Sequence, residues 1–159
     1  MKYLVVILLF VTTANAQSRF IETNKVDEFT GKRIIQTISV ELEIEQSGRE
    51  PLLAHNGFVV YEDGLWACVL GFGSKTWAFL GEREAHFLVD GTRSTRALSN
   101  VERIAEGGYV IHVLAVRLDK SFLRMLEHAR SVRVKIGHYI FDMTEVVDEE
   151  ISAVKQIIH

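Results

Sequence analysis

Apolar and polar side chains alternate along much of the chain after residue 30, and this period of two predicts β-strands. The first clear example covers residues 34–45. The positions expected on its buried face are Ile34, Ile38, Val40, Leu42 and Ile44. Threonine, serine and three glutamates occupy the other face, which is typical of a strand with one face in water. The polar segment 46–51 contains a glycine and the chain's one proline, and we expect it to end this strand.

A hairpin is predicted next, because two apolar runs, 58–61 and 65–70, are joined by Glu62-Asp63-Gly64. A three-residue connection that contains Asp-Gly is typical of two antiparallel strands. The following segment Gly71-Phe72-Gly73-Ser74-Lys75 is expected to interrupt the sheet before a further short strand at 76–80.

Three more strands are expected in the middle of the chain. Residues 86–89 form an apolar run that the turn pair Asp90-Gly91 closes, and residues 97–104 carry a weaker strand pattern. Gly107-Gly108 then leads into residues 109–118, which are largely apolar on both faces. We therefore expect this last strand to be central in the sheet or covered on both sides.

The period changes after Asp119, where apolar residues recur at helical spacing. The residues of this short helix that face the core are expected to be Phe122, Leu123, Leu126 and Ala129. Asp119 or Ser121 can cap its start. Residues 132–136 return to alternation, with Arg133 and Lys135 pointing outward, and residues 139–143 continue as a strand.

A C-terminal amphipathic helix completes the pattern, with Thr144 as its expected N-cap. Its apolar stripe is predicted at Val147, Ile151, Val154 and Ile158. The acidic residues near its start, including the run Asp148-Glu149-Glu150, suit the positive end of the helix dipole.

These elements together predict a mainly β (α+β) fold. We expect an antiparallel β-sandwich or curled sheet with one short helix and a C-terminal amphipathic helix. Strands and helices do not alternate along the chain, which argues against a parallel nucleotide-binding sheet.

The N-terminus has the layout of a secretory signal peptide over residues 1–16. Lys2 supplies a positive start, an apolar run follows, and small residues precede the cleavage expected before Gln17. The apolar run is shorter than the roughly 20 residues that a membrane span needs. We therefore expect residues 17–159 to form a single exported β-rich domain, periplasmic or secreted, with no transmembrane segment.

Charge and cysteine content narrow the function classes. Removing residues 1–16 takes away one cation, so the formal net charge changes from −3 to −4. A slightly acidic domain lacks the basic footprint of a nucleic-acid-binding protein. The one cysteine, Cys68, cannot form an internal disulfide, and its apolar neighbours predict that it is buried.

Three stretches together resemble a loose class of exported bacterial β-domains without an assigned activity, common in the Bacteroidota. They are Asp27-Glu28-Phe29-Thr30-Gly31, Phe87-Leu88-Val89-Asp90-Gly91, and the unit 118–137, in which a short helix delivers a strand. A C-terminal amphipathic helix closes such domains. The resemblance implies an exported β-rich architecture and brings no catalytic residues with it.

Known catalytic and metal-binding motifs do not fit the chain. Residues 71–76 echo a phosphate-binding loop, but Ser74 stands where that motif needs the glycine directly before its Lys-Thr pair. The six histidines lack the spacing of metal ligands, so no metal or other cofactor is predicted.

The leading hypothesis is a non-enzymatic exported domain that binds an envelope or secreted protein partner through its loops. Phe72 and Trp77, if exposed, would form the recognition surface, and Lys75 and Arg93 would add positive charge. One alternative is an exported hydrolase whose site is assembled from His86, Asp90 and His138. Another is an inhibitor or immunity-type protein that inserts the loop 71–76 into a partner's cleft.

Overall fold

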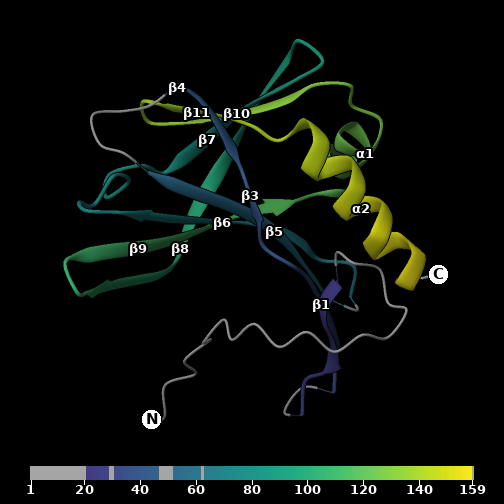
Figure 1. Ribbon diagram of the computed structural model, residues 1–159. Helices are drawn as coiled ribbons and strands as arrows, with labels where there is room; N and C mark the ends of the chain where they lie inside the picture. The colour runs from purple at the N-terminus through teal and green to yellow at the C-terminus, as the bar shows by residue number, and fades with distance from the viewer. Residues whose placement is uncertain (1–20, 29–30, 47–51, 62, 159) are drawn as a thin grey trace.

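The computed structural model describes residues 21–28, 31–46, 52–61 and 63–158. The described chain forms a curled antiparallel β-sheet with two helices on its inner side (Figure 1). The predicted signal peptide, most of the segment expected to end the first strand, and residues 29–30 of the resemblance lie outside the described residues. The expected mainly β fold with two helices is confirmed, in its curled-sheet form.

The described chain contains eleven β-strands and two α-helices. They are β1 (Ile21–Val26), β2 (Arg33–Thr37), β3 (Val40–Glu41), β4 (Glu43–Gln46), β5 (Leu53–Tyr61), β6 (Trp66–Ser74), β7 (Glu84–Val89), β8 (Thr92–Glu106), β9 (Tyr109–Leu118), α1 (Lys120–Glu127), β10 (Val132–Ile136), β11 (Tyr139–Asp142) and α2 (Thr144–Ile158). Neighbouring strands in the sheet run in the order β1-β2-β5-β6-β9-β8-β7-β10-β11-β4, and β3 pairs with β5 off this path.

Strand β8 connects the two halves of the sheet. Residues 92–97 pair with β7, whereas residues 98–106 pair with β9. A register shift between Asn100 and Glu102 lies in the second part. Because one strand belongs to both halves, the sheet curls around a common core, whose largest buried side chains include Phe58, Phe79, Phe87, Phe122 and Phe141.

The predicted hairpin is confirmed as β5 and β6, but β6 is longer than expected. The expected break at 71–75 is wrong, because Gly71, Phe72, Gly73 and Ser74 pair with β9 inside the sheet. Hydrogen bonding from strands on both sides outweighs the weak strand preference of glycine. The short strand expected at 76–80 is also absent, and this part of the chain forms turns instead.

The long strand expected over 34–45 is divided between β2, β3 and β4. Strands β2 and β3 pair with β5, whereas β4 pairs with β11 at the other end of the sheet. Ile35 and Thr37 are buried in β2, so its inward face is the opposite of the one predicted. Thr37 faces inward because its hydroxyl has buried hydrogen-bond partners, which the alternation alone does not reveal.

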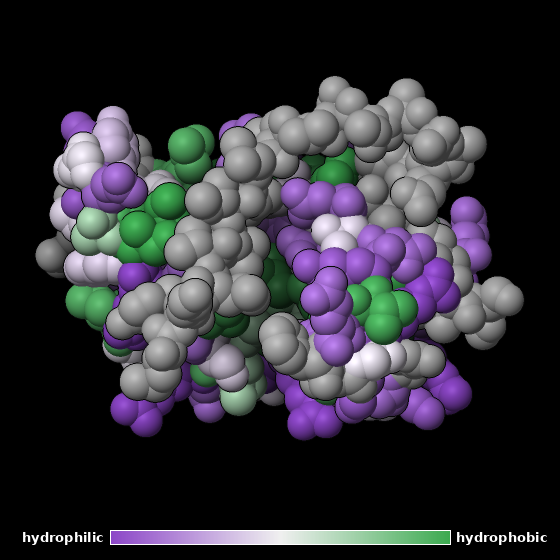
Figure 2. Space-filling model, turned by 90° about the horizontal axis from the view of Figure 1, so that it is seen from below, coloured by the Kyte–Doolittle hydropathy of each residue, from purple (hydrophilic) through white to green (hydrophobic). Residues whose placement is uncertain are grey.

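Strand β9 is central, as expected, between β6 and β8. Only its inner face is fully buried, and Tyr109 and Ile111 on the outer face remain 61% and 46% exposed. The view from below shows apolar surface toward the left, on the side of the β8–β9 hairpin (Figure 2). Among the described residues, β9 is therefore covered on one side.

The short helix α1 is confirmed, and Asp119 caps it by accepting a hydrogen bond from the Phe122 amide at 2.8 Å. Helix α2 begins at Thr144, but that residue is not its side-chain cap. The Asp142 carboxylate accepts from the Thr144 amide at 2.8 Å, while the Thr144 hydroxyl accepts from the Val132 amide at 3.0 Å. Thr144 therefore ties the start of α2 to β10.

The inner face of α2 matches its predicted stripe at Val147, Ile151 and Val154, and the side chain of Ile158 lies outside the described residues. Glu150, expected with its acidic neighbours to complement the dipole at the helix start, lies beyond the first turn and is fully buried. No described helix has the length and apolarity needed to cross a membrane.

The turn Asp90-Gly91 is confirmed, and its first residue also anchors a distant segment. Both residues have positive φ, 47° and 81°, as a two-residue hairpin turn requires. The Asp90 carboxylate accepts hydrogen bonds from the backbone amides of Arg130 and Ser131, each at 2.9 Å. The turn thereby positions the connection between α1 and β10.

Replacing Asp90 tests this anchor. Asp90→Ala removes both hydrogen bonds and places a β-carbon without a polar group at positive φ, so we expect a loss of about 1–3 kcal/mol in the free energy of unfolding. Asp90→Asn keeps a side-chain oxygen and the tolerance for positive φ, and should lose less than half of that amount. Urea unfolding measures both changes, and an Asp90→Ala variant as stable as the original protein would contradict the anchor.

Candidate functional site

The four residues predicted to bind a partner do not form one surface. Phe72 is 2% exposed and packs against Phe79 and Phe141, with ring centroids 4.4 and 5.4 Å apart. It is therefore a core residue that cannot contact a partner in this conformation. Lys75 is exposed just beyond the end of β6, whereas Arg93 is exposed on β8.

Trp77 is half-buried, and is therefore less exposed than Lys75 and more exposed than Phe72. Its ring meets the buried imidazole of His112 edge-on, with centroids 5.9 Å apart. Burial and the nearby Arg103 lower the pKa of His112, which favours its neutral form. The contact between Trp77 and His112 is therefore a packing contact between two uncharged rings.

The three residues of the hydrolase hypothesis are also separated. Asp90 is bound to backbone amides at the start of β10, and His138 follows the other end of that strand. The strand rise places these two residues about 15–20 Å apart. His86 pairs with Lys135 between them, so the three side chains cannot share a proton at hydrogen-bond distance.

Cys68 is buried, as predicted, and its thiol donates a hydrogen bond to the Asn56 side-chain oxygen at 2.9 Å. Burial, and secondarily the nearby Glu150, raise the pKa of the thiol well above its ordinary value. It is therefore not an activated nucleophile. Within the described segments, no group of three or more histidine, cysteine and acidic side chains is arranged to hold a metal ion.

A shallow groove of about 510 Å³ lies on the outer face of β7, β8, β10 and β11. The strand registers determine which side chains meet there. Arg93 lies opposite Leu88, which lies opposite Arg133, and in the next row His86 lies between Thr95 and Lys135. This face, which we call the basic groove, therefore gathers Arg93, His86, Arg133 and Lys135 from three adjacent strands.

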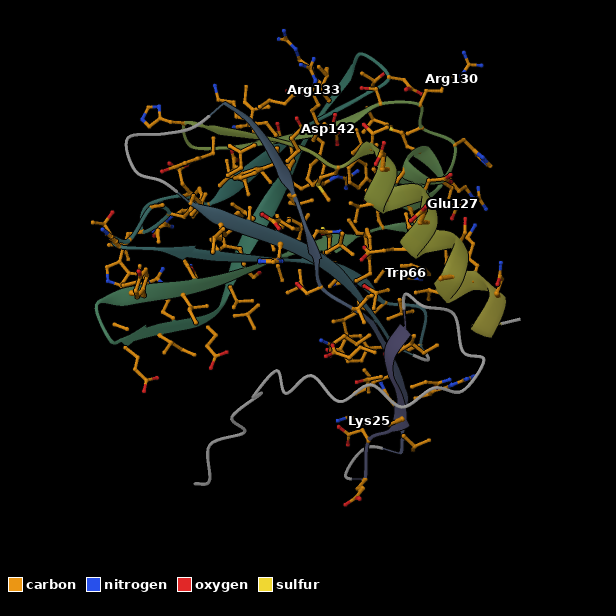
Figure 3. The ribbon with its side chains drawn as sticks, in the orientation of Figure 1. Lys25, Trp66, Glu127, Arg130, Arg133 and Asp142 are labelled. Atoms are coloured by element: carbon orange, nitrogen blue, oxygen red, sulfur yellow. The ribbon has the colours of Figure 1, made fainter. Side chains whose placement is uncertain are left out.

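The cations of the basic groove are only partly neutralised. Arg133 lies 3.4 Å from the Glu45 carboxylate across an exposed pair, which contributes little binding energy. Arg93 and Lys135 form no ion pair with any residue in the described segments. Figure 3 shows Arg133 directed away from the two helices, on the outer side of the sheet. The groove is therefore open to an anionic ligand.

Uncharged groups complete the groove. The half-buried side chains of Leu88 and Ile140 lie among the cations. His86 Nδ1 and the Thr95 hydroxyl are 3.0 Å apart and hydrogen-bonded. A groove with cations and apolar side chains suits a ligand that has carboxylates as well as some apolar surface.

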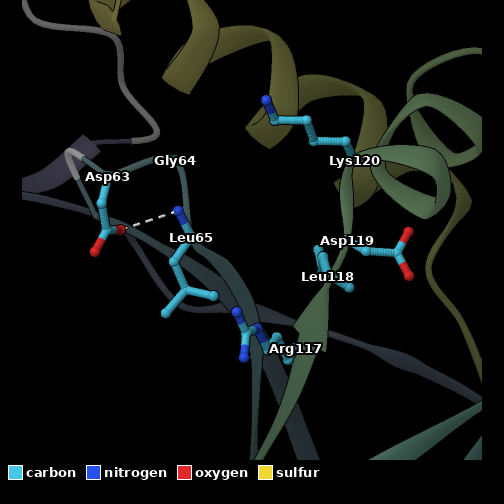
Figure 4. Close-up of a pocket in the computed structure, with 7 residues that line it drawn as sticks. All are labelled: Asp63, Gly64, Leu65, Arg117, Leu118, Asp119 and Lys120. Carbon is cyan, nitrogen blue, oxygen red and sulfur yellow. Dashed lines mark hydrogen bonds between the residues drawn. The ribbon is translucent and has the colours of Figure 1, made fainter.

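A second hollow, of about 500 Å³, lies between the β5–β6 turn and the junction of β9 with α1 (Figure 4). Its acidic side chains already have structural partners. Asp63 pairs with Lys32 at 2.9 Å and accepts from the Leu65 amide at 3.2 Å. Asp119 caps α1 and also bonds Arg96. The other charged side chains of this hollow are two cations, Arg117 and Lys120, compared with three cations in the basic groove.

Some residues of the basic groove are predictable from the sequence, but their assembly on one face is not. Arg93 was predicted as a binding residue, and the alternation in 132–136 correctly placed Arg133 and Lys135 outward. Their proximity depends on β7 lying between β8 and β10, and the paired residues of β7 and β10 are 43 to 49 positions apart, from Val89 with Val132 to His86 with Lys135. No local pattern reports that pairing.

Comparisons with protein-family models, curated proteins and solved structures found no match. Functional inference therefore depends on the side chains that the fold brings together. The basic groove brings together three cations, and two of them, Arg93 and Lys135, form no ion pair within the described segments.

Two substitutions distinguish core from surface near the end of β6. Phe72→Ala should lower the free energy of unfolding by about 3–5 kcal/mol, because it leaves a cavity between Phe79 and Phe141. Lys75→Ala removes an exposed side chain and should change stability by less than about 0.5 kcal/mol. Chemical denaturation compares them, and equal small effects would show that Phe72 is not a core residue.

Proposed function

We propose that this protein is an exported, non-enzymatic binding domain whose basic groove recognises an acidic segment of a protein partner. The observation that supports this most directly is the convergence of Arg93, Arg133 and Lys135 on one outward face with His86 among them. The chain as a whole is nevertheless slightly acidic, with a formal net charge of −3. On an acidic protein, a basic face attracts an acidic ligand to that face, while the remaining acidic surface repels it.

The spacing of the cations favours an extended chain as the ligand. Arg133 and Lys135 are two residues apart on β10, so their α-carbons are separated by about 6.8 Å. Alternate side chains of an extended peptide have the same separation. An acidic residue at every second position of such a peptide would therefore meet one cation each, while Leu88 and Ile140 contact the intervening backbone or apolar side chains.

The test compares two charge-matched triple variants. Arg93→Ala/Arg133→Ala/Lys135→Ala removes the groove cations, and Lys25→Ala/Arg117→Ala/Lys120→Ala removes three exposed cations elsewhere. Lys25 lies on β1, far from Arg133 in the molecule (Figure 3). Fluorescence anisotropy with labelled poly-L-glutamate measures the dissociation constant of each form.

We expect the groove variant to bind at least tenfold more weakly than the original protein, and the control variant to bind within about threefold of it, corresponding to about 1.4 and 0.6 kcal/mol. Binding should also weaken as salt is raised, because the contacts are exposed charges. Equal losses in both variants would indicate a net-charge effect and contradict the groove. Binding to a sulfated polysaccharide without binding to poly-L-glutamate would contradict a protein ligand.

A further inference from the structure

A cluster of buried polar side chains lies beneath α2, on the inner side of the sheet and away from the basic groove. Its members are Glu150 on α2, Thr37 on β2, Asn56 on β5 and Cys68 on β6, each no more than 1% exposed. Each of the three strands thus contributes one polar side chain to the cluster. The inner face of α2 around Glu150 is otherwise apolar. A buried carboxylate at such a place is costly unless it is paired or protonated.

The hydrogen bonds of this cluster converge on Glu150. The Thr37 hydroxyl donates to one carboxylate oxygen at 3.3 Å, and the Asn56 side-chain amide donates to the other at 2.9 Å. Thr37 in turn accepts from the Phe58 amide at 2.8 Å, and Asn56 accepts from the Cys68 thiol at 2.9 Å. One ionisable group therefore joins the helix directly to β2 and β5, and Asn56 connects it further to Cys68 on β6.

No cation compensates this carboxylate among the described residues. The other titratable group that faces it is the Cys68 thiol. Strands β2, β5 and β10 also contact α2. Arg33 on β2 lies four residues from Thr37 and donates a hydrogen bond to Asn24 at 2.8 Å, and His55 on β5 lies on the opposite face from Asn56. On β10, the cations Arg133 and Lys135 belong to the outer face. Between α1 and α2, Lys155 pairs with Glu127 at 2.5 Å, and both groups are engaged there. An ionised Glu150 would therefore be a buried charge with only neutral partners.

We propose that α2 is a pH-sensitive latch, held on the sheet while Glu150 is protonated and released when that proton is lost. Release would separate Val147, Ile151 and Val154 from the inner face of the sheet and uncover the buried residues of β2, β5 and β10 that contact α2, together with the polar cluster. The latch acts on the opposite side of β10 from the basic groove, and it does not depend on what the groove binds.

The sign of the pH dependence follows from burial. Desolvation raises the pKa of Glu150 to about 8 from its ordinary value of 4.5, although the hydrogen bonds from Thr37 and Asn56 oppose that shift. An acid with a raised pKa in the folded state stabilises that state fully below its unfolded pKa. The stabilisation is then lost progressively as pH rises from about 4.5 to about 8. In the middle of this range the released fraction should increase about tenfold per pH unit.

Cys68 is a native reporter of release, because it is the chain's one cysteine and is hydrogen-bonded within the cluster. The experiment measures the rate at which a thiol reagent labels Cys68, divided by the rate for the denatured protein at the same pH. That ratio removes the intrinsic pH dependence of the thiol. For the original protein it should increase on the order of 50-fold between pH 6 and pH 8.

Two variants assign the effect. Glu150→Gln removes the titrating group and should make the ratio independent of pH, whereas Asp148→Asn, an exposed position on the same helix, should follow the original protein. In hydrogen exchange, the protection factor of each amide is the unfolded-chain exchange rate divided by the observed rate at the same pH. The protection factors of the α2 amides should fall with rising pH in parallel with the Cys68 ratio, and those of the β9 amides should change less. A Glu150→Gln variant that keeps the full pH dependence would overturn the latch.

A direct titration decides the matter if Glu150→Gln does not fold. Carbon-13 NMR of labelled glutamate carboxyls in the original protein should show one group that titrates well above the others and shifts together with the signals of α2. If every glutamate carboxyl of the folded protein titrates near its ordinary value, the latch is wrong. If the raised group titrates without any change in α2, Glu150 is buried without acting as a latch.

Discussion

Strand β8 pairs with both halves of the sheet, and this double pairing sets the shape of the whole fold. Its first part pairs with β7 and its second part with β9, so a continuous backbone ladder forces the two halves of the sheet to face a shared core. That curl brings Phe72 and Phe141, from opposite halves, into contact. The same pairing aligns Arg93 with the cations of β10 on the outside. One strand thus determines both the core and the basic groove.

Strand β10 separates the two features that we associate with function. Its inward side chains, Val132, Val134 and Ile136, are buried in the core, while Arg133 and Lys135 face outward. The proposed binding face and the proposed latch therefore lie on opposite sides of one sheet. Ligand binding on the outer face uses exposed cations, whose interactions are screened by salt and water. The latch uses the buried carboxyl group of Glu150, whose pKa is raised because water does not reach it. The alternation of a strand supplies both environments within a few ångströms.

Local patterns predicted those elements whose stabilising contacts are close in sequence. The cap at Asp119, the hairpin turn between β5 and β6, and the turn at Asp90 depend on neighbours a few residues away, and all three form. The expectations about 34–45, 71–75 and Glu150 were wrong for the opposite reason. In each case a distant strand or helix supplies the partner that decides the conformation, as β9 does for Gly71 and β5 does for Glu150.

Local sequence patterns were sufficient to predict the mainly β class, the two helices, the burial of Cys68 and the outward direction of Arg133 and Lys135. Periodicity and turn chemistry act over a few residues, so a single chain segment carries that information. The folded arrangement of distant segments places Arg93 beside those two cations and buries Glu150 beside Asn56. Those arrangements depend on strand order and helix docking, which the hydrophobic effect and long-range hydrogen bonding settle across the whole molecule.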